Sequence, residues 1–414
     1  MQKIKEYFLY GLAVFPFLGI LTETFIQTNV IYVWGILSLI LVLLITISQR
    51  GKVRVPLYLK YFFFFLLYTM IRNYMFSDLF SVINLFKNRF LFFFTISLII
   101  ENTQYDNKLI KNYKKLLILL FISSFLITLV QIFNRKFLIN PAREQYMEFV
   151  YGNRNRFPSI YSWSGGRYST SMTTLSISAI FIHDFIVKQK PKMIAIVLTI
   201  AAFIIFLTQT RWGMVGFFIL LFVFYLYSNR KNKIFDLFKI LLISVIITII
   251  IINLLPFVGI NTEKIVNDRI LQTDRTLVEN SGYTRILAFK YFARFFPKQP
   301  IFGNGGFLED DLIRFIGGRS SQIHVGYLQL FYFYGLLGGT LYLLFFYNLI
   351  KRSYKLGKHI NVWFPFMIII IYAWSLMTLV YLGPLEPGIF SALIFYRYYN
   401  DKNNYYGQRI NYVQ

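Results

Sequence analysis

Cysteine is absent from this chain of 414 residues, which excludes disulfides, thiolate nucleophiles and cysteine-based metal sites. Acidic residues are scarce as well, with 18 Asp and Glu against 43 Lys and Arg, and the long apolar runs contain almost none of them. Carriers coupled to protons or sodium usually need acids within the membrane, so that class of protein is disfavoured.

Apolar residues fill the chain instead: 57% are hydrophobic, 20% are aromatic and the mean hydropathy is +0.55. Many runs reach the roughly 17 to 25 apolar residues that cross a hydrocarbon core. They lack the alternation of a barrel strand, so they predict helices. The expected fold class is an all-α integral membrane protein.

About twelve membrane spans are predicted, and they make one polytopic membrane domain over residues 1–414. The N-terminal apolar run is followed by further spans and by no small-residue cleavage site, so it is expected to be the first retained helix. The spans are expected near residues 7–24, 29–48, 59–76, 84–100, 115–133, 168–187, 193–210, 212–228, 237–257, 324–349, 362–382 and 385–397.

The positive charge follows these spans. Every second connection is rich in Lys or Arg, as in "VKQKPK" and "KRSYKLGKH", and this is typical of cytoplasmic connections. We therefore expect a multi-pass membrane protein with both termini in the cytoplasm. The net charge of +25 then reflects topology and membrane lipids, and no nucleic-acid partner is expected.

Two outer connections are long, residues 134–167 and 258–323, and long loops are commonly binding or catalytic. The outer face carries mostly Arg, whose planar fork suits phosphate or carboxylate oxygens. Any single one of these arginines is readily explained as a solvated or lipid-contacting residue. As a set, they favour an anionic ligand on the outer face.

Two of these arginines stand at predicted span ends. Arg211 interrupts the apolar stretch of "LTQTRWGMVGF", where it is expected either to make a tight outer turn or to bind a ligand. Arg167 opens the sixth span in "SGGRYSTSMTTL", ahead of small hydroxyl residues that suit close helix packing. Both are candidates for binding an anion.

The second long loop contains "SGYTRILAFKYFARFFPKQP", in which Ile286, Phe289, Phe292 and Phe296 share one helical face. This pattern predicts an amphipathic helix on the membrane interface that carries Arg285 and Arg294. Glycines follow it in "FGNGGF". They permit a left-handed turn and a close backbone approach to a ligand, although a plain loop hinge explains them equally well. The glycines concerned are Gly303, Gly305 and Gly306.

Only three histidines occur, and the predicted topology places His183 and His359 at cytoplasmic ends. His324 is left as the outer imidazole, and a histidine is readily poised to accept a proton near neutral pH. A helix-capping or packing role is the competing interpretation. Asp310 and Asp311 are an adjacent acidic pair, but an acidic helix start explains them as well as a cation site does. No metal and no cofactor are expected.

These motifs, in this order, resemble the bacterial O-antigen polymerase and O-antigen ligase superfamily, which includes Wzy-type capsule and exopolysaccharide polymerases. The resemblance covers about the C-terminal half, through "LTQTRWGMVGF", "SGYTRILAFKYFARFFPKQPIFGNGGF" and "SSQIHVGYLQLFYFYGLLGG". Arg211, Arg285 and His324 match the family directly, and Arg167 matches an Arg often found before the corresponding span. The chain departs from the family at Val325, where Asn is common, and at Gln209, near a usual Ser.

The resemblance implies a GT-C-like helical fold and metal-independent transfer of a glycan from an undecaprenyl-diphosphate carrier. His324 would act on the acceptor hydroxyl as a base or an orienting group. Arg211, Arg285, Arg167 and Arg294 would bind the diphosphate, and inversion at the anomeric carbon is expected. The expected partners are lipid-linked glycan donor and acceptor, membrane lipids and a chain-length regulator protein.

Three functions remain open at this point. A repeat-unit polymerase leads, and a ligase that moves finished glycan to another acceptor shares its donor chemistry. A lipid-linked polysaccharide flippase also needs about twelve spans and arginines for a diphosphate. A flippase is expected to hold its cations in a central cavity, whereas here they gather at outer span ends and in long loops.

Overall fold

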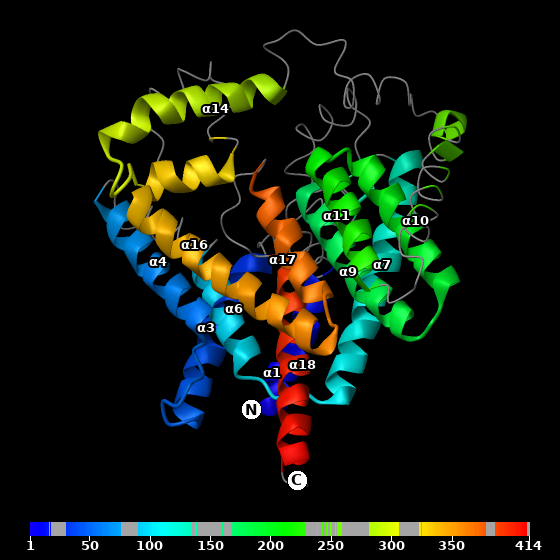
Figure 1. Cartoon of the computed structure of the whole chain (residues 1–414), viewed down its shortest axis with the longest axis horizontal. Coiled ribbons are helices and arrows are strands. Elements are labelled where there is room, and N and C mark those ends of the chain that lie inside the picture. Colours follow the sequence, from blue (N-terminus) through cyan, green and yellow to red (C-terminus); the bar gives the residue numbers. More distant parts are fainter. Residues whose placement is uncertain are drawn as a thin grey trace.

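The structure is a computed structural model in which the elements described are helices and the turns that join them (Figure 1). No strand occurs among the described residues, which confirms the all-helical prediction for that part of the chain. The described residues are 1–15, 17, 30–75, 90–134, 137–138, 157, 159, 167–227, 238, 242, 246, 249–250, 253, 255–258, 281–305, 323, 325–377 and 386–411.

Among the described residues, continuous helices lie in eleven of the twelve predicted spans, the few described residues of the span at 237–257 are also mostly helical, and an additional helix, α14, lies in the second long loop. In chain order the described helices are α1 (Gln2–Ala13), α3 (Val30–Ser48), α4 (Leu57–Tyr74), α6 (Phe92–Glu101), α7 (Asn107–Phe133), α9 (Arg167–Val187), α10 (Pro191–Thr208), α11 (Arg211–Tyr227), α14 (Ser281–Phe295), α16 (Gly326–Ile360), α17 (Phe364–Ser375) and α18 (Pro387–Asn411), with short 3-10 turns at Leu255–Val258 and Phe296–Lys298.

Three described helices are long and apolar enough to cross a membrane: Asn107–Phe133, Tyr168–Val187 and Gly326–Ile360. Shorter apolar helices accompany them, and twelve spans remain a prediction. Three described helices extend well beyond the predicted spans: α7, α16 and α18, the last of which continues to Asn411 instead of 397. Helix α7 begins at Asn107 instead of 115, because Asp106 caps it by accepting a hydrogen bond from the Leu109 N–H at 2.7 Å. Helix α16 continues to Ile360 instead of 349.

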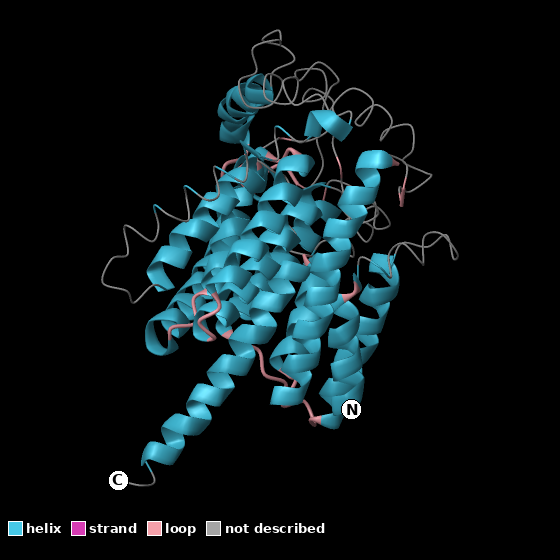
Figure 2. Cartoon of the chain, turned by 90° about the vertical axis from the view of Figure 1, so that its right-hand side faces the viewer, coloured by secondary structure: helices cyan, strands magenta, loops and turns pink. Residues whose placement is uncertain are grey.

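The helices form one bundle with two distinct ends (Figure 1). The chain termini lie together at one end, here called the termini end, and a view from the side shows them there again (Figure 2). The opposite end, called the α14 end, carries α14. The basic connections predicted to be cytoplasmic lie at the termini end (Figure 1), among them "QRGKVRVPLYLK" at residues 49–60, "NKLIKNYKK" at 107–115 and "VKQKPK" at 187–192.

Aromatic side chains fill the core between α4, α6 and α16. The Phe62 ring lies 4.8 Å from the Phe93 ring and 4.8 Å from the Phe345 ring, measured between centroids. Burial of such rings carries a large hydrophobic contribution, and their edge contacts add specificity. This core fixes α16 against α4 and thereby the polar segments that precede it.

Helix α16 is broken at Gly335, whose φ of 60° and ψ of −167° are not helical. Residues 326–334 therefore form a short arm that lies across the bundle, and residues 336–360 form the long helix that descends from it (Figure 1). The predicted single span over 324–349 is wrong in this respect. A break frees two N–H and two C=O groups that an unbroken helix would pair.

The turn at residues 300–305 pairs all four freed groups. Gly303, with φ of +71°, approaches so closely that a Cβ added to it would lie 2.3 Å from the Gly335 nitrogen. Only glycine fits such an approach at positive φ. The four hydrogen bonds run from Leu336 N to Pro300 O (2.8 Å), Leu337 N to Ile301 O (3.1 Å), Asn304 N to Tyr332 O (2.9 Å) and Gly305 N to Phe333 O (2.8 Å).

Helix α14 packs on the arm of α16 through the Tyr291 and Tyr332 hydroxyls, which are 2.9 Å apart. Tyr291 is fully buried, whereas Ile286 and Phe289, on the face predicted to meet the membrane, are exposed. The helix thus has two apolar sides: one packs on protein, and the other is free to meet lipid.

Candidate functional site

The first turns of α9 and α11 meet at the α14 end. The Tyr168 ring lies 5.1 Å from the Trp212 ring, and the Ser171 hydroxyl bonds both Thr208, at 3.0 Å, and Thr210. A Cβ added to Gly213 would lie 2.6 Å from the Thr210 hydroxyl. Small side chains therefore allow the two helix starts to approach closely.

This packing places two predicted arginines on neighbouring helix starts. Arg211 is the first residue of α11, follows Thr210 directly and is half-buried. Arg167 is the first residue of α9 and stands four residues before Ser171. Gln209, at the predicted departure from the family, is the left-handed residue that ends α10.

The end of α17 and the start of α16 also lie beside the starts of α9 and α11. The Tyr168 hydroxyl lies 3.2 Å from that of Ser375, and the next residue, Leu376, accepts a 2.9 Å hydrogen bond from the Gly326 N–H. His324 lies outside the described residues. Its described neighbours Ile323 and Val325 are both buried. Val325 thus fills an apolar position where the family commonly carries Asn.

Arg285 approaches this region along α14. The arm of α16 and α14 run in the same direction in Figure 1 and are joined by Tyr291 and Tyr332. Arg285 and Gly326 each stand six residues before their tyrosine, about 9 Å at helical rise. Arg285 on α14 therefore lies at the same level as Gly326, at the start of the α16 arm. Burial lowers the pKa of the Arg285 guanidinium, yet an arginine remains protonated at physiological pH.

Sequence reasoning missed Glu386, which precedes α18 and is only 8% exposed. One of its carboxylate oxygens accepts a hydrogen bond from Ser169 at 3.1 Å, and the other has no hydrogen-bond partner among the described residues. A buried carboxylate is costly unless it is paired. The available signal was "GPLEPG", an acid between two prolines at the entrance to a predicted span.

The remaining predicted residues stand apart from these helix starts. Arg294 is nine residues beyond Arg285 on α14, about 13 Å along the helix, and its guanidinium lies over the Phe295 ring at 5.4 Å. Gly303 and Gly305 approach α16 backbone, as described above, and Gly306 lies outside the described residues. Within the described part of the chain, no group of three or more His, Asp or Glu could hold a metal ion.

Four helices therefore begin at this region, α9, α11, α16 and α18 (Figure 1). A helix start presents unpaired N–H groups and a partial positive charge, which favour an anion. Arginines at two of these starts add full charges. A helical membrane protein with such a site can bind a phosphate-bearing ligand at one end of its bundle.

A family model described as O-antigen ligase matches residues 195–343. The match runs from α10 through the arm of α16 and includes Arg211, Arg285 and His324. It confirms the predicted resemblance to the O-antigen polymerase and ligase superfamily, whose members are membrane enzymes that process glycans. No individual curated protein matches the chain.

Proposed function

We propose that this protein polymerises undecaprenyl-diphosphate-linked oligosaccharide repeat units on the outer face of the bacterial plasma membrane, as in O-antigen, capsule or exopolysaccharide synthesis. The reaction is an inverting glycosyl transfer of GT-C type. The observation that carries the proposal is the meeting of the α9 and α11 starts, each beginning with an arginine.

A diphosphate is the ligand that this arrangement suits best. Moving the charged diphosphate into the bilayer core would cost desolvation energy, so the diphosphate stays near the interface while the undecaprenyl tail enters the membrane. Arg211 and Arg285 provide flat donor forks for its oxygens, and the helix starts provide backbone N–H groups. Arg167 completes the proposed set of diphosphate-binding cations, and Arg294, about 13 Å further along α14 than Arg285, is left out of it.

In the proposed reaction an acceptor hydroxyl oxygen forms a bond to the anomeric carbon of the donor while the bond from that carbon to the diphosphate oxygen breaks. The electron pair leaves with the undecaprenyl diphosphate, whose growing charge Arg211 and Arg285 stabilise. His324 takes the proton of the hydroxyl. No step requires a metal ion or a cofactor.

Transfer by a ligase is the alternative within the same family, because it would use the same donor and the same residues. Purified protein in liposomes with only the lipid-linked repeat unit separates the two. A ladder of lengthening products supports polymerisation, whereas products formed only after a different acceptor is added support ligation.

Replacement of His324 by Ala in a strain that makes the native glycan tests the mechanism. Accumulation of single lipid-linked units on the outer leaflet is expected, and His359→Ala, at the termini end, is the matched control that should leave polymer unchanged. Accumulation on the inner leaflet would indicate a flippase. Normal polymer from the His324→Ala strain would refute the role of this residue.

A further inference from the structure

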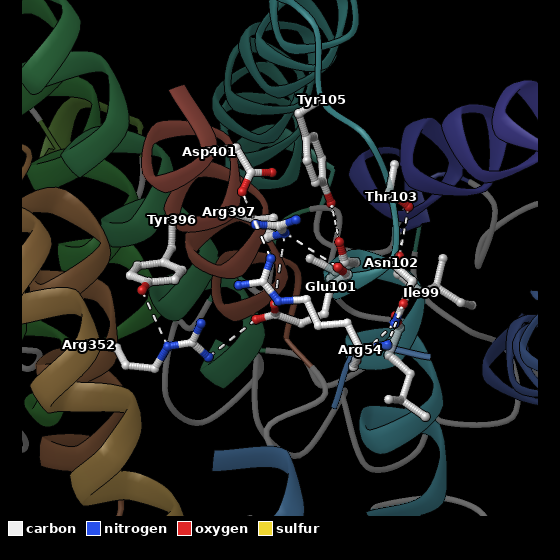
Figure 3. Close-up of polar contacts among 12 residues, drawn as sticks. Arg54, Ile99, Glu101, Asn102, Thr103, Tyr105, Arg352, Tyr396, Arg397 and Asp401 are labelled. Atoms are coloured by element: carbon white, nitrogen blue, oxygen red, sulfur yellow. Dashed lines mark hydrogen bonds and ion pairs between the residues drawn. The ribbon is translucent and has the colours of Figure 1, made fainter. Parts of the chain in front are cut away.

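A second charged cluster lies at the termini end, far from the residues discussed above. The buried carboxylate of Glu101 accepts a hydrogen bond from the Tyr58 hydroxyl at 3.0 Å. Three guanidiniums converge on it (Figure 3). They belong to Arg352 at 3.5 Å, Arg54 at 3.8 Å and Arg397 at 3.9 Å, and Asp401 also pairs with Arg397.

A pocket of about 480 Å³ opens beside this cluster, between the ends of α1, α3 and α6 and the middle of α18. Its charged lining comprises Lys5, Lys52, Arg54 and Arg397 against the single carboxylate of Glu101. Asp401 compensates one further charge, at 3.9 Å from Arg54. Cations remain in excess, so the pocket favours an anion.

Lys5 is the most informative of these residues because it is only 5% exposed. Its ammonium carries three donors, and the Asn102 carbonyl accepts one of them at 2.6 Å. No carboxylate pairs with it among the described residues, and burial lowers its pKa. An ammonium that is buried without a counter-charge leaves a place for an anionic group.

Lys52 and Arg54 supply donors from the pocket rim. The Lys52 side chain is exposed and its ammonium makes no hydrogen bond or ion pair within the described part of the chain, and the Arg54 side chain is 45% exposed. Both carboxylates near Arg54 lie at 3.8 Å or more, too far for a hydrogen bond. Its fork is available to oxygens of a phosphate.

We infer that this pocket binds the phosphate head group of an anionic phospholipid of the leaflet at the termini end. The apolar surface beside it supplies the place for the acyl chains. On α3, Ile40, Leu44 and Ile47 form an exposed stripe at helical spacing, and this stripe ends at Ser48 and Gln49 in the pocket lining.

A lipid explains both features at once. Its head group meets the excess of cations, and its chains follow α3 without leaving the membrane. A free phosphate would use the same donors, but it would gain nothing from the apolar stripe. The inference does not depend on the proposed enzymatic function, because the pocket shares no residue with the site at the α14 end.

Native mass spectrometry of the purified full chain tests the inference, with phosphatidylglycerol and phosphatidylcholine as probes. The wild type should retain phosphatidylglycerol preferentially. A Lys5→Gln/Lys52→Gln variant should lose retention on the order of 20-fold, since each cation near a membrane surface contributes about fivefold. Lys358→Gln removes an exposed charge at the same end but outside the pocket, and it should bind as the wild type does.

Three results would overturn the assignment: equal retention by wild type and double variant, equal retention of both lipids, or displacement of phosphatidylglycerol by millimolar inorganic phosphate. The last result would assign the pocket to free phosphate. If the double variant fails to fold, Lys52→Gln alone decides the question. Its side chain has no contact to lose, and an unchanged retention in it would refute the inference.

Discussion

Two glutamates are buried among the described residues, one at each end of the bundle, and their surroundings differ. Glu101, at the termini end, has a tyrosine hydroxyl and three guanidiniums around it. Glu386, at the α14 end, has one serine hydroxyl, and its second oxygen finds no hydrogen bond in the described part of the chain. Glu101 joins helices through its ion pairs, whereas Glu386 keeps one carboxyl oxygen without a hydrogen bond in the described part of the chain.

The largest expected effect is on folding, at Glu101. Glu101→Gln leaves the half-buried Arg352 and Arg397 and the exposed Arg54 without their shared carboxylate, and breaking a buried ion pair in this way costs about 3 to 5 kcal/mol. Thermal unfolding in detergent should show the loss as a large fall in melting temperature.

Glu386→Gln is the matched control for that experiment. It removes a buried carboxylate that has no cation beside it among the described residues, so the melting temperature should stay the same or rise, while polymer formation falls. If both variants unfold alike, the contrast between the two ends is wrong.

The next effect is on catalysis, at Arg211. Arg211→Gln should lower polymer formation on the order of 100-fold, the size expected when one donor to a developing negative charge is lost. Arg211→Lys should recover part of it, because the charge remains without the fork. The assay is product length from lipid-linked repeat units in liposomes. Lys298→Gln removes an exposed cation at the same end, and activity in this variant should remain near wild type.

A smaller difference in stability is expected between alanine substitutions at two glycines with similar φ, Gly303 and Gly51. Gly303→Ala meets the α16 backbone at 2.3 Å, whereas a Cβ at Gly51, in a turn at the termini end, meets nothing within 4 Å. Both variants carry the cost of positive φ, roughly 1 to 2 kcal/mol. Only Gly303→Ala should add the cost of moving backbone, so its melting temperature should fall further. Equal melting temperatures would show that the turn yields without cost.

The smallest effect concerns the exposed side of α14. Phe289→Ser should leave the melting temperature in detergent within the range of ordinary surface substitutions, about 0.5 kcal/mol, but lower activity severalfold in liposomes, where this face meets lipid. Tyr291→Phe, which removes the contact to the α16 arm, should instead cost about 1 kcal/mol in detergent. A large loss of stability in Phe289→Ser would place that face against protein.

Sequence reasoning located most helices because each apolar run must satisfy its backbone internally. It also placed Arg211 at a helix start, since an arginine that interrupts an apolar stretch favours an end. The break in α16 was not predictable. Gly335, Gly338 and Gly339 occur in one run, and only the docking of the 300–305 turn makes the first of them non-helical, while Tyr68 and Phe331 pack against the other two.

In the candidate site, too, some residues were predictable from the sequence and others depended on tertiary packing. Arg167 and Arg211 stand out by charge alone, but their proximity depends on Ser171 and Thr210, which in sequence are ordinary packing residues. Glu386 escaped notice because a carboxylate near a helix start is common at protein surfaces. Its burial arises from α9 and α18 packing together, and Gly388 allows that approach.

The break at Gly335 also indicates where the hydrocarbon region ends. The four backbone groups that it frees are paired by a turn of irregular chain, and irregular backbone exposed to lipid is not tolerated within the bilayer core. We therefore expect Gly335 at or above the edge of that core. From there residues 336–360 extend about 37 Å, longer than the core thickness of roughly 30 Å. Their slanted course (Figure 1) would accommodate the excess length, and we expect the α16 arm and α14 to lie in the head-group region.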